Sequence, residues 1–266
     1  NTKRFVPMCF YSEEYLRICE QEFAKVVALG ASGMLYDECQ HHSVAKLCFS
    51  DRHGHRYGAP VYRQDNELIR RLRPLAPGDF LVGGEACYDL EMQQYPLAYF
   101  RTESLQHLPL YRYALPRAQY MTAVTGFDDR DMVNQCLLYR YIISYEPYNF
   151  KGRLPDYPAT VAYGRRMDEL RTELAYWFWD GECLDTCGGT VVDGRGIAHR
   201  PYSVFRAQDG SLALAVANYG DAAVSVRAQL TEDAPLVRWR LVDGEDWHSG
   251  EEAELPPHSA AVFLPR

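Results

Sequence analysis

Short apolar runs alternate with amphipathic segments over the first two-thirds of the chain. The runs lie at 4–10, 33–37, 80–85, 97–101, 109–115 and 139–146, and each has the length and composition of a strand. The run FLVGGE at 80–85 is apolar at successive positions, which is typical of a parallel strand covered on both faces. Strands separated by helical segments at this spacing predict a parallel α/β architecture.

Amphipathic spacing predicts a helix after the first run. Ser12 is a suitable N-cap, and Glu13 and Glu14 place negative charge in the first turn, where the helix dipole favours it. Leu29 and Gly30 end the apolar period, because glycine accepts the left-handed conformation that often follows a helix. Two further helices are predicted at 66–72 and 158–179.

The hydrophobic pattern changes after about Asp185. From Tyr202 onward, short segments alternate apolar and polar residues with a period of two, and turns such as the one at 209–210 separate them. This pattern predicts an antiparallel β-sandwich. We therefore expect two domains, a partial (β/α)8 catalytic barrel over 1–185 and a C-terminal β-sandwich over 186–266.

The six predicted parallel strands are fewer than the about eight of a closed (β/α) barrel. No glycine-rich phosphate loop follows any of them, which disfavours a doubly wound nucleotide-binding sheet. The simplest interpretation is the C-terminal portion of a (β/α)8 TIM barrel, about strands 3 to 8, followed by the sandwich. The first two βα units would then precede Asn1 in the same polypeptide, or a homo-oligomer would cover the open edge.

Charge and composition exclude two classes of partner. The formal net charge is −8 at pH 7 and no cluster of lysine and arginine is present, so neither nucleic acid nor an anionic membrane is expected as a partner. No run of about 18 apolar residues predicts a transmembrane helix. Several of the eight cysteines lie within apolar segments and resemble buried residues more than a disulfide framework, which favours a reducing, cytoplasmic compartment.

Carboxylates stand at the ends of successive predicted strands. Asp37 ends the run at 33–37, and Glu85 ends the run at 80–85. Functional groups of a parallel barrel gather at the carboxyl ends of its strands, and glycoside hydrolysis needs two carboxyl groups flanking the scissile bond. Because neighbouring strands lie about 4.8 Å apart, Asp37 and Glu85 are the predicted catalytic pair.

Other polar residues at strand ends and in the loop that follows Asp37 are predicted to bind the substrate. A sugar offers many hydroxyl groups, and carboxylate, imidazole, guanidinium and phenol groups can each hydrogen-bond them. These residues are Glu38, His53, His55, Asp89, Arg112, Tyr113 and Glu146.

The loop after Asp37 is also rich in cysteine and histidine, which leaves a metal site or a thiol nucleophile as alternatives. The spacing of these residues matches no standard structural zinc pattern, so the expectation is that no metal or other cofactor is bound. Cys39 with a nearby histidine could instead serve as a nucleophile. The potential metal ligands are Cys39, His41, His42, Cys48, His53 and His55.

The order of these motifs resembles a known group of barrel proteins. PMCF, GASGMLYDE, a cysteine, HGH, VGGEA, YRY and RRMDELR follow one another over 4–185, as in the glycoside-hydrolase-like proteins described as DUF6259. That resemblance implies a barrel with a trailing β-sandwich. More distantly, the chain is similar to the retaining α-glycosidase barrels of the α-amylase and α-galactosidase-like groups. The α-amylase likeness implies that Asp37 is the nucleophile and Glu85 the acid/base, although Leu35 stands where that group has an arginine.

Together these features predict a glycoside hydrolase that cleaves the O-glycosyl bonds of a carbohydrate substrate. Two carboxylates would carry the reaction, with retention of configuration. Two alternatives stay open. The chain could be a non-catalytic carbohydrate-binding protein on a degenerate barrel, or a metal-dependent hydrolase that uses the cysteine and histidine loop.

Overall fold

The computed structural model describes residues 8–37, 47–60, 64–85, 91–102, 104–125, 129–146, 152–231 and 235–265. The chain divides into two compact units, Asn1–Phe100 and Arg101–Arg266. Each unit has its own arrangement of strands and helices. The domain boundary expected near 185 stays a prediction.

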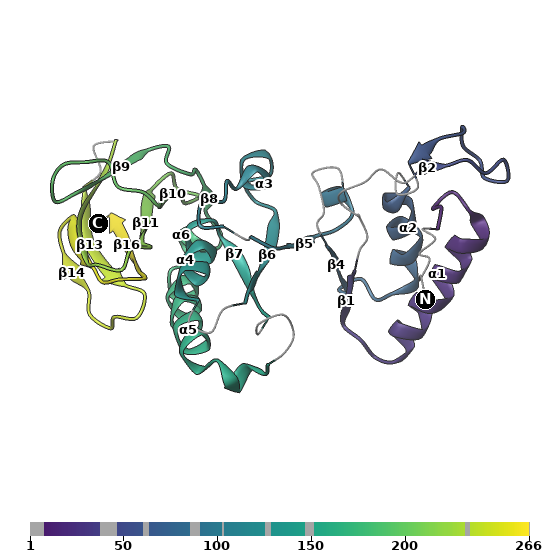
Figure 1. Ribbon diagram of the computed structural model, residues 1–266, viewed down its shortest axis with the longest axis horizontal. Coiled ribbons are helices and arrows are strands. Elements are labelled where there is room, and N and C mark those ends of the chain that lie inside the picture. The colour runs from purple at the N-terminus through teal and green to yellow at the C-terminus, as the bar shows by residue number, and fades with distance from the viewer. Residues whose placement is uncertain are drawn as a thin grey trace. The chain divides into compact units, whose positions relative to one another are not determined.

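The first unit contains parallel strands covered by two helices. Strand β4 lies between β1 and β5, and both neighbours run parallel to it. A short antiparallel pair, β2 and β3, lies within the long loop after β1 (Figure 1). The elements are α1 (Glu13–Ala28), β1 (Gly33–Tyr36), β2 (Leu47–Cys48), β3 (Ala59–Pro60), α2 (Asp65–Leu72), η1 (Arg73–Leu75), β4 (Leu81–Glu85), η2 (Glu91–Gln93) and β5 (Leu97–Phe100).

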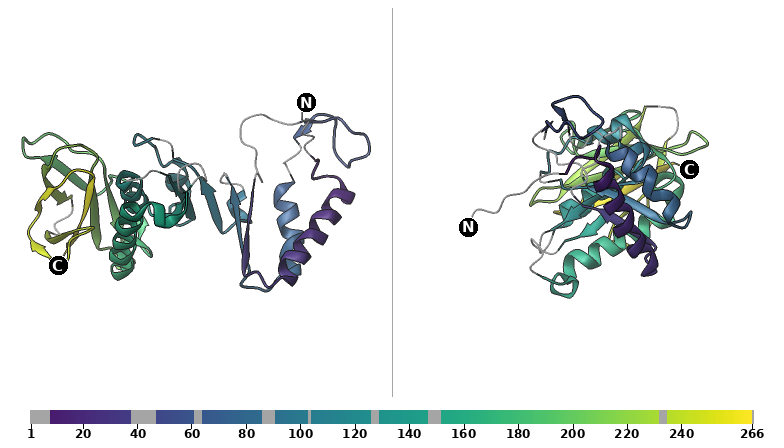
Figure 2. Two further views of the ribbon diagram at one scale, coloured as in Figure 1. Left: turned by 60° about the horizontal axis from the view of Figure 1, so that its bottom comes forward. Right: turned by 90° about the vertical axis from the view of Figure 1, so that its right-hand side faces the viewer.

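Helix α1 begins and ends where its sequence predicts. The Ser12 hydroxyl accepts a hydrogen bond from the Tyr15 backbone N–H at 3.4 Å, and Gly30 adopts φ +83° just beyond the helix. Figures 1 and 2 show α1 and α2 side by side, and a 2.8 Å ion pair between Arg71 and Glu13 joins them. The two helices therefore cover one face of the strands. No helix among the described residues is long and apolar enough to cross a membrane.

The second unit begins with a further pair of parallel strands and their helices. Strands β6 and β7 are parallel, and α4 packs against both β7 and α5 (Figure 1). The predicted helix at 158–179 is divided at Leu174 into two helices. The elements are α3 (Leu110–Ala114), β6 (Gln119–Val124), α4 (Arg130–Leu138), β7 (Tyr141–Tyr145), η3 (Leu154–Asp156), α5 (Pro158–Glu173) and α6 (Ala175–Phe178).

The strand predicted at 109–115 is wrong, because this segment forms helix α3. A short apolar run does not distinguish a strand from a helix by its period alone. Pro109 occupies the N-cap position, and the buried Arg112 side chain is held by carbonyl groups that only the folded chain brings near it. The parallel strand lies instead at β6. Of the first predicted strand, 4–7 lie outside the described residues, and 8–10 form no strand.

Antiparallel sheets make up the rest of the second unit, as the alternating pattern predicts. One sheet has the order β14-β13-β16-β11-β10-β8 and the other β15-β12-β9. Their facing apolar residues share one core, to which Val204, Leu214 and Phe263 contribute from the larger sheet and Val226 and Leu255 from the smaller. The strands are β8 (Glu182–Cys183), β9 (Gly189–Asp193), β10 (Tyr202–Arg206), β11 (Leu212–Asn218), β12 (Val224–Leu230), β13 (Leu236–Leu241), β14 (His248–Ser249), β15 (Glu252–Leu255) and β16 (Ser259–Pro265).

The two central strands of the larger sheet are buried along their whole length. Every residue of β11 and β16 is buried. One face of this pair meets the smaller sheet, and helix α4 packs on both strands as well. The sandwich and the helical layer of the second unit therefore form one continuous body.

Three buried arginines hold the backbone of the second unit where its elements meet. Arg112, Arg140 and Arg171 are each no more than 2% exposed. Arg140 adopts φ +55° directly after α4, and burial, together with the neighbouring Arg112, lowers its pKa to about 10. The side chain therefore stays protonated at neutral pH. Its guanidinium donates to the carbonyl oxygens of Pro116, Trp179 and Gly181 at 2.9, 3.1 and 2.6 Å.

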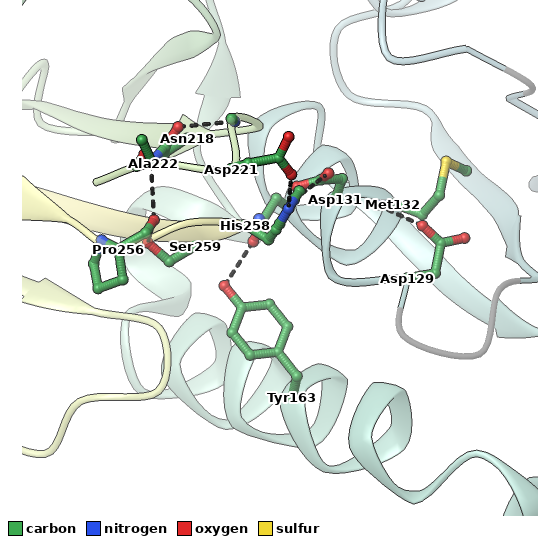
Figure 3. Close-up of polar contacts among 12 residues, drawn as sticks. Asp129, Asp131, Met132, Tyr163, Asn218, Asp221, Ala222, Pro256, His258 and Ser259 are labelled. Atoms are coloured by element: carbon green, nitrogen blue, oxygen red, sulfur yellow. Dashed lines mark hydrogen bonds and ion pairs between the residues drawn. The ribbon is translucent and has the colours of Figure 1, made fainter. Parts of the chain in front are cut away.

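A second link joins the sandwich to α4 through His258. This residue lies in the turn before β16, and its ring contacts Asp131 of α4 at 2.8 Å and Asp221 of the β11–β12 turn at 3.1 Å (Figure 3). The hydrogen bond to Asp131, and then that to Asp221, raises the pKa of His258 above its ordinary value. Asn218 links the β11–β12 turn to the turn before β16. Its amide N–H groups donate to backbone carbonyls on both sides.

Replacing Arg140 with alanine tests the role of the buried guanidinium. The variant removes this donor from three carbonyl groups, of which Pro116 still accepts a hydrogen bond from Arg112. Trp179 and Gly181 lose the donor altogether, and each orphaned acceptor costs about 1–3 kcal/mol. We expect the free energy of unfolding to fall by about 3 kcal/mol or more, measured by urea denaturation. Arg195→Ala, at a side chain that is 78% exposed, is the control and should change stability by about 0.5 kcal/mol at most. Equal losses in both variants would contradict the assignment.

The His258 contacts predict a pH-dependent contribution to stability. Because the folded state raises the pKa, protonated His258 stabilises the fold fully below about pH 6.5, and the contribution disappears as pH rises through the raised pKa. The difference in unfolding free energy between the wild type and His258→Gln should therefore shrink between about pH 6 and about pH 9. Urea denaturation at several pH values measures it. A difference that grows with pH would refute the proposed ion pairing.

Candidate functional site

The two predicted catalytic carboxylates lie at the ends of neighbouring parallel strands. Strands β1 and β4 pair in parallel, with Tyr36 opposite Gly84 as the last pair. Asp37 directly follows Tyr36, and Glu85 directly follows Gly84. Each acid is thus the residue that follows the last β1–β4 pair. The first side chain is exposed and the second half-buried, so both can meet a ligand.

The alternation of side chains indicates the face of the strands on which Glu85 lies. Tyr36 points toward the helices, because its hydroxyl interacts with Tyr15 of α1, and burial there raises its pKa. On the opposite face, the Leu35 side chain comes within 3.3 Å of the point where a Cβ on Gly83 would stand. Side chains two residues apart in a strand point the same way. Glu85, the last residue of β4, therefore follows Gly83 on the face away from the helices, and Asp37 lies just beyond β1.

A glycine permits the close approach of these two strands. A Cβ added to Gly33 would lie 2.7 Å from the Leu81 carbonyl oxygen and 3.0 Å from the Leu81 Cβ. A backbone atom at that distance cannot rotate away, so a larger residue would force the strands apart. The spacing between Asp37 and Glu85 thus depends on glycine at the beginning of β1.

The other predicted substrate-binding residues are dispersed. Glu38 and Asp89 lie outside the described residues. In the second unit, Glu146 follows β7 and forms a 3.2 Å ion pair with Arg101, and Tyr113 of α3 is 48% exposed. The substrate-binding role of these four residues stays a prediction.

The Arg112 side chain is buried and has a structural role instead of lying open to a substrate. It is 1% exposed, and burial lowers its pKa. A guanidinium that is fully engaged by backbone cannot also bind a sugar hydroxyl. Its N–H groups donate to the carbonyl oxygens of Pro116, Ala118, Tyr139 and Arg140 at 2.6–3.1 Å.

The loop histidines, His53 and His55, contact two cysteines. The ligand atoms of Cys9, Cys48, His53 and His55 all lie within 4.8 Å of one another. Both ring nitrogens of His55 are engaged, Nε2 with the Cys9 Sγ at 3.4 Å and Nδ1 with the Arg56 carbonyl at 2.8 Å. A sugar hydroxyl therefore finds no vacant nitrogen on His55.

Cys9 belongs to this group although no sequence pattern predicted it there. Cys9 precedes α1 and is separated from His55 by 46 residues in the chain. Its position in an apolar run indicated only a buried residue, so no local spacing could reveal its partners. The other predicted loop ligands, Cys39, His41 and His42, lie outside the described residues. The described cysteines at 9, 19, 48, 136, 183 and 187 are free thiols.

Comparison with known proteins relates the fold to glycoside hydrolases. No family model and no curated protein matches the chain. Among solved structures, a maltogenic α-amylase from Thermotoga neapolitana is similar with TM-score 0.59 at 11% identity, over 100% of this chain and 69% of that one. An α-amylase from Geobacillus thermoleovorans gives 0.56 at 14%, over 95% and 64%. The isomalto-dextranase of Arthrobacter globiformis T6 gives 0.55 at 13%, over 93% and 48%.

At these identities the similarity shows the fold alone. The chain has an α/β architecture like that of glycoside hydrolases, with parallel strands followed by antiparallel sheets. It spans about half the length of the isomalto-dextranase and about two-thirds of the two α-amylases. The resemblance to the DUF6259 group stays a prediction.

Replacing Gly33 with alanine tests the close approach of β1 and β4. The added Cβ meets the Leu81 backbone, and overpacking of this kind costs about 1–3 kcal/mol. We expect the midpoint of thermal unfolding to fall. Gly78→Ala is the matched control, because a Cβ there meets nothing within 4 Å. If both variants melt at the same temperature as the wild type, the strands are not held together at Gly33.

Proposed function

We propose that the protein is a glycoside hydrolase whose two catalytic carboxyl groups belong to Asp37 and Glu85. The observation that carries the proposal is the parallel register of β1 and β4, whose next residues are these two acids. The similarity of the fold to α-amylases and to an isomalto-dextranase supports it, because such barrels place their chemistry at the carboxyl ends of strands.

The spacing of neighbouring strands favours a retaining mechanism. Adjacent parallel strands lie about 4.8 Å apart, and retaining enzymes hold their carboxyl groups about 5–5.5 Å apart. Asp37 would attack the anomeric carbon while Glu85 protonates the departing glycosidic oxygen. Glu85 would then remove a proton from the water that hydrolyses the glycosyl–Asp37 ester, which restores both carboxyl groups.

The substrate class that we propose is an α-linked glucan. The similar solved structures include α-amylases and an isomalto-dextranase, one bound to acarbose and one to panose. Dextran, starch and their oligosaccharides are therefore the first substrates to assay.

We also propose that further strands complete the barrel around this site. Leu35 and Leu81, on the strand face away from the helices, are 46% and 48% exposed. The interior of a closed barrel is filled by such apolar side chains. The missing strands would come from polypeptide beyond this chain or from a second copy of it.

Substituting each catalytic acid tests the proposal. Glu85→Gln should lower kcat on natural glucans by about 10²–10⁴-fold, the usual contribution of a general acid. On aryl glycosides, whose phenolate leaves without protonation, the loss should be smaller. Asp37→Asn should abolish turnover on both kinds of substrate, because no nucleophile remains. Kinetic assays with circular dichroism measure activity and fold together.

Asp79→Asn is the matched control, since Asp79 is exposed and precedes β4 at its opposite end. Its activity should equal that of the wild type. Full activity of Asp37→Asn or Glu85→Gln would refute the assignment, and saturable sugar binding without any hydrolysis by the wild type would favour a non-catalytic carbohydrate-binding protein.

A further inference from the structure

Four metal-ligating side chains converge at one point of the first unit. Cys9 immediately precedes α1, Cys48 ends β2, and His53 and His55 belong to the loop between β2 and β3. Their ligand atoms lie within 4.8 Å of one another. Two thiols and two imidazoles from separate segments thus surround one small volume.

The distances within the group suit a tetrahedral ion. Cys9 Sγ lies 3.4 Å from His55 Nε2, and Cys48 Sγ lies 3.2 Å from His53 Nδ1. Zinc binds sulfur at about 2.3 Å and imidazole nitrogen at about 2.0–2.1 Å, so tetrahedral angles put the two ligand atoms about 3.5 Å apart. These two separations are close to this value, and all other pairs lie within 4.8 Å.

The surroundings orient His55 as they do in metal sites. Its Nδ1 contacts the Arg56 carbonyl at 2.8 Å, which fixes the tautomer with the proton on Nδ1 and leaves the Nε2 lone pair directed at the cluster. The Tyr11 ring packs against the imidazole with 4.8 Å between centroids. A metal ligand needs this kind of second contact, whereas a solvated loop histidine does not.

The alternative is a pair of thiol–imidazole hydrogen bonds. That arrangement accounts for each pair but not for the convergence of both pairs on one point. It also leaves the Cys9 and Cys48 thiols side by side. A divalent cation accounts for the convergence of all four side chains, because it binds both sulfurs as thiolates together with the two imidazoles.

The loop that carries the histidines has no hydrophobic core of its own. None of residues 47–60 is buried, and Phe49 and Tyr57 are 65% and 68% exposed. Small segments that bury little apolar surface are commonly held by a disulfide or a metal ion. The cluster is the point at which this loop meets the residues before α1.

We propose that Cys9, Cys48, His53 and His55 bind one Zn²⁺ in a closed tetrahedral site that fixes the β2–β3 loop to the beginning of α1. Two sulfur and two nitrogen ligands in tetrahedral array favour zinc over magnesium or calcium. Four protein ligands leave no position for water, so the ion is structural. Binding converts both thiols to thiolates and releases two protons to solvent.

Metal analysis of the purified protein tests this site. After reconstitution with zinc and removal of the excess, mass spectrometry should find about one zinc per chain, as for a structural site. Cys48→Ser and His53→Gln should each lose nearly all of it. Cys187→Ser and His248→Gln, at exposed residues elsewhere in the chain, are the matched controls and should retain it.

Cobalt substitution gives an independent readout on the wild-type protein. Co²⁺ bound by two thiolates should show sulfur-to-cobalt charge-transfer absorption and the intense visible bands of a tetrahedral ion, and Zn²⁺ should displace it. Chelation should increase proteolytic cleavage between 47 and 60. Absence of zinc and of the cobalt bands, or unchanged zinc in Cys48→Ser and His53→Gln, would overturn the site. Asp37→Asn should bind zinc fully, so the outcome is independent of the proposed hydrolysis.

Discussion

Backbone carbonyl groups that are withdrawn from water must find donors, and in the second unit three arginine side chains supply them. The chain leaves α4 in a left-handed turn at Arg140, where glycine is the residue that local geometry favours. Arginine stands there because its planar guanidinium reaches three carbonyls in two separate segments. Arg112 and Arg171 likewise donate to carbonyl groups between α4 and the beginning of β7. The strands, the short helices and the sandwich of this unit meet around these three side chains.

The first unit depends on a different constraint, which is the close parallel approach of β1 and β4. Glycine at Gly33 permits it, and the common register then brings Asp37 and Glu85 to one edge of the strands. In the proposed mechanism, the spacing of adjacent strands would hold the two carboxyl groups near the separation that glycosidic chemistry requires.

The cysteine and histidine cluster and the proposed catalytic carboxylates lie in the same unit but have different roles, the first structural and the second catalytic. A closed site of two thiols and two imidazoles has no vacant coordination position, so it stabilises a loop without activating water. The proposed hydrolysis needs two carboxylates and no metal ion. His53 and His55 consequently change role, from groups predicted to hold sugar hydroxyls to ligands that hold the loop beside α1.

Local signals in the sequence determined several of the regular elements and the candidate acids. The Ser12 cap with Gly30 bounds α1, and the apolar run before Glu85 is β4, because caps and periodicity act over a few residues. Only tertiary structure decided which groups meet across longer separations. It made 109–115 a helix around the buried Arg112, and it joined Cys9 to His55 across 46 residues. Such contacts depend on the path of the whole chain, and a local pattern carries no information about that path.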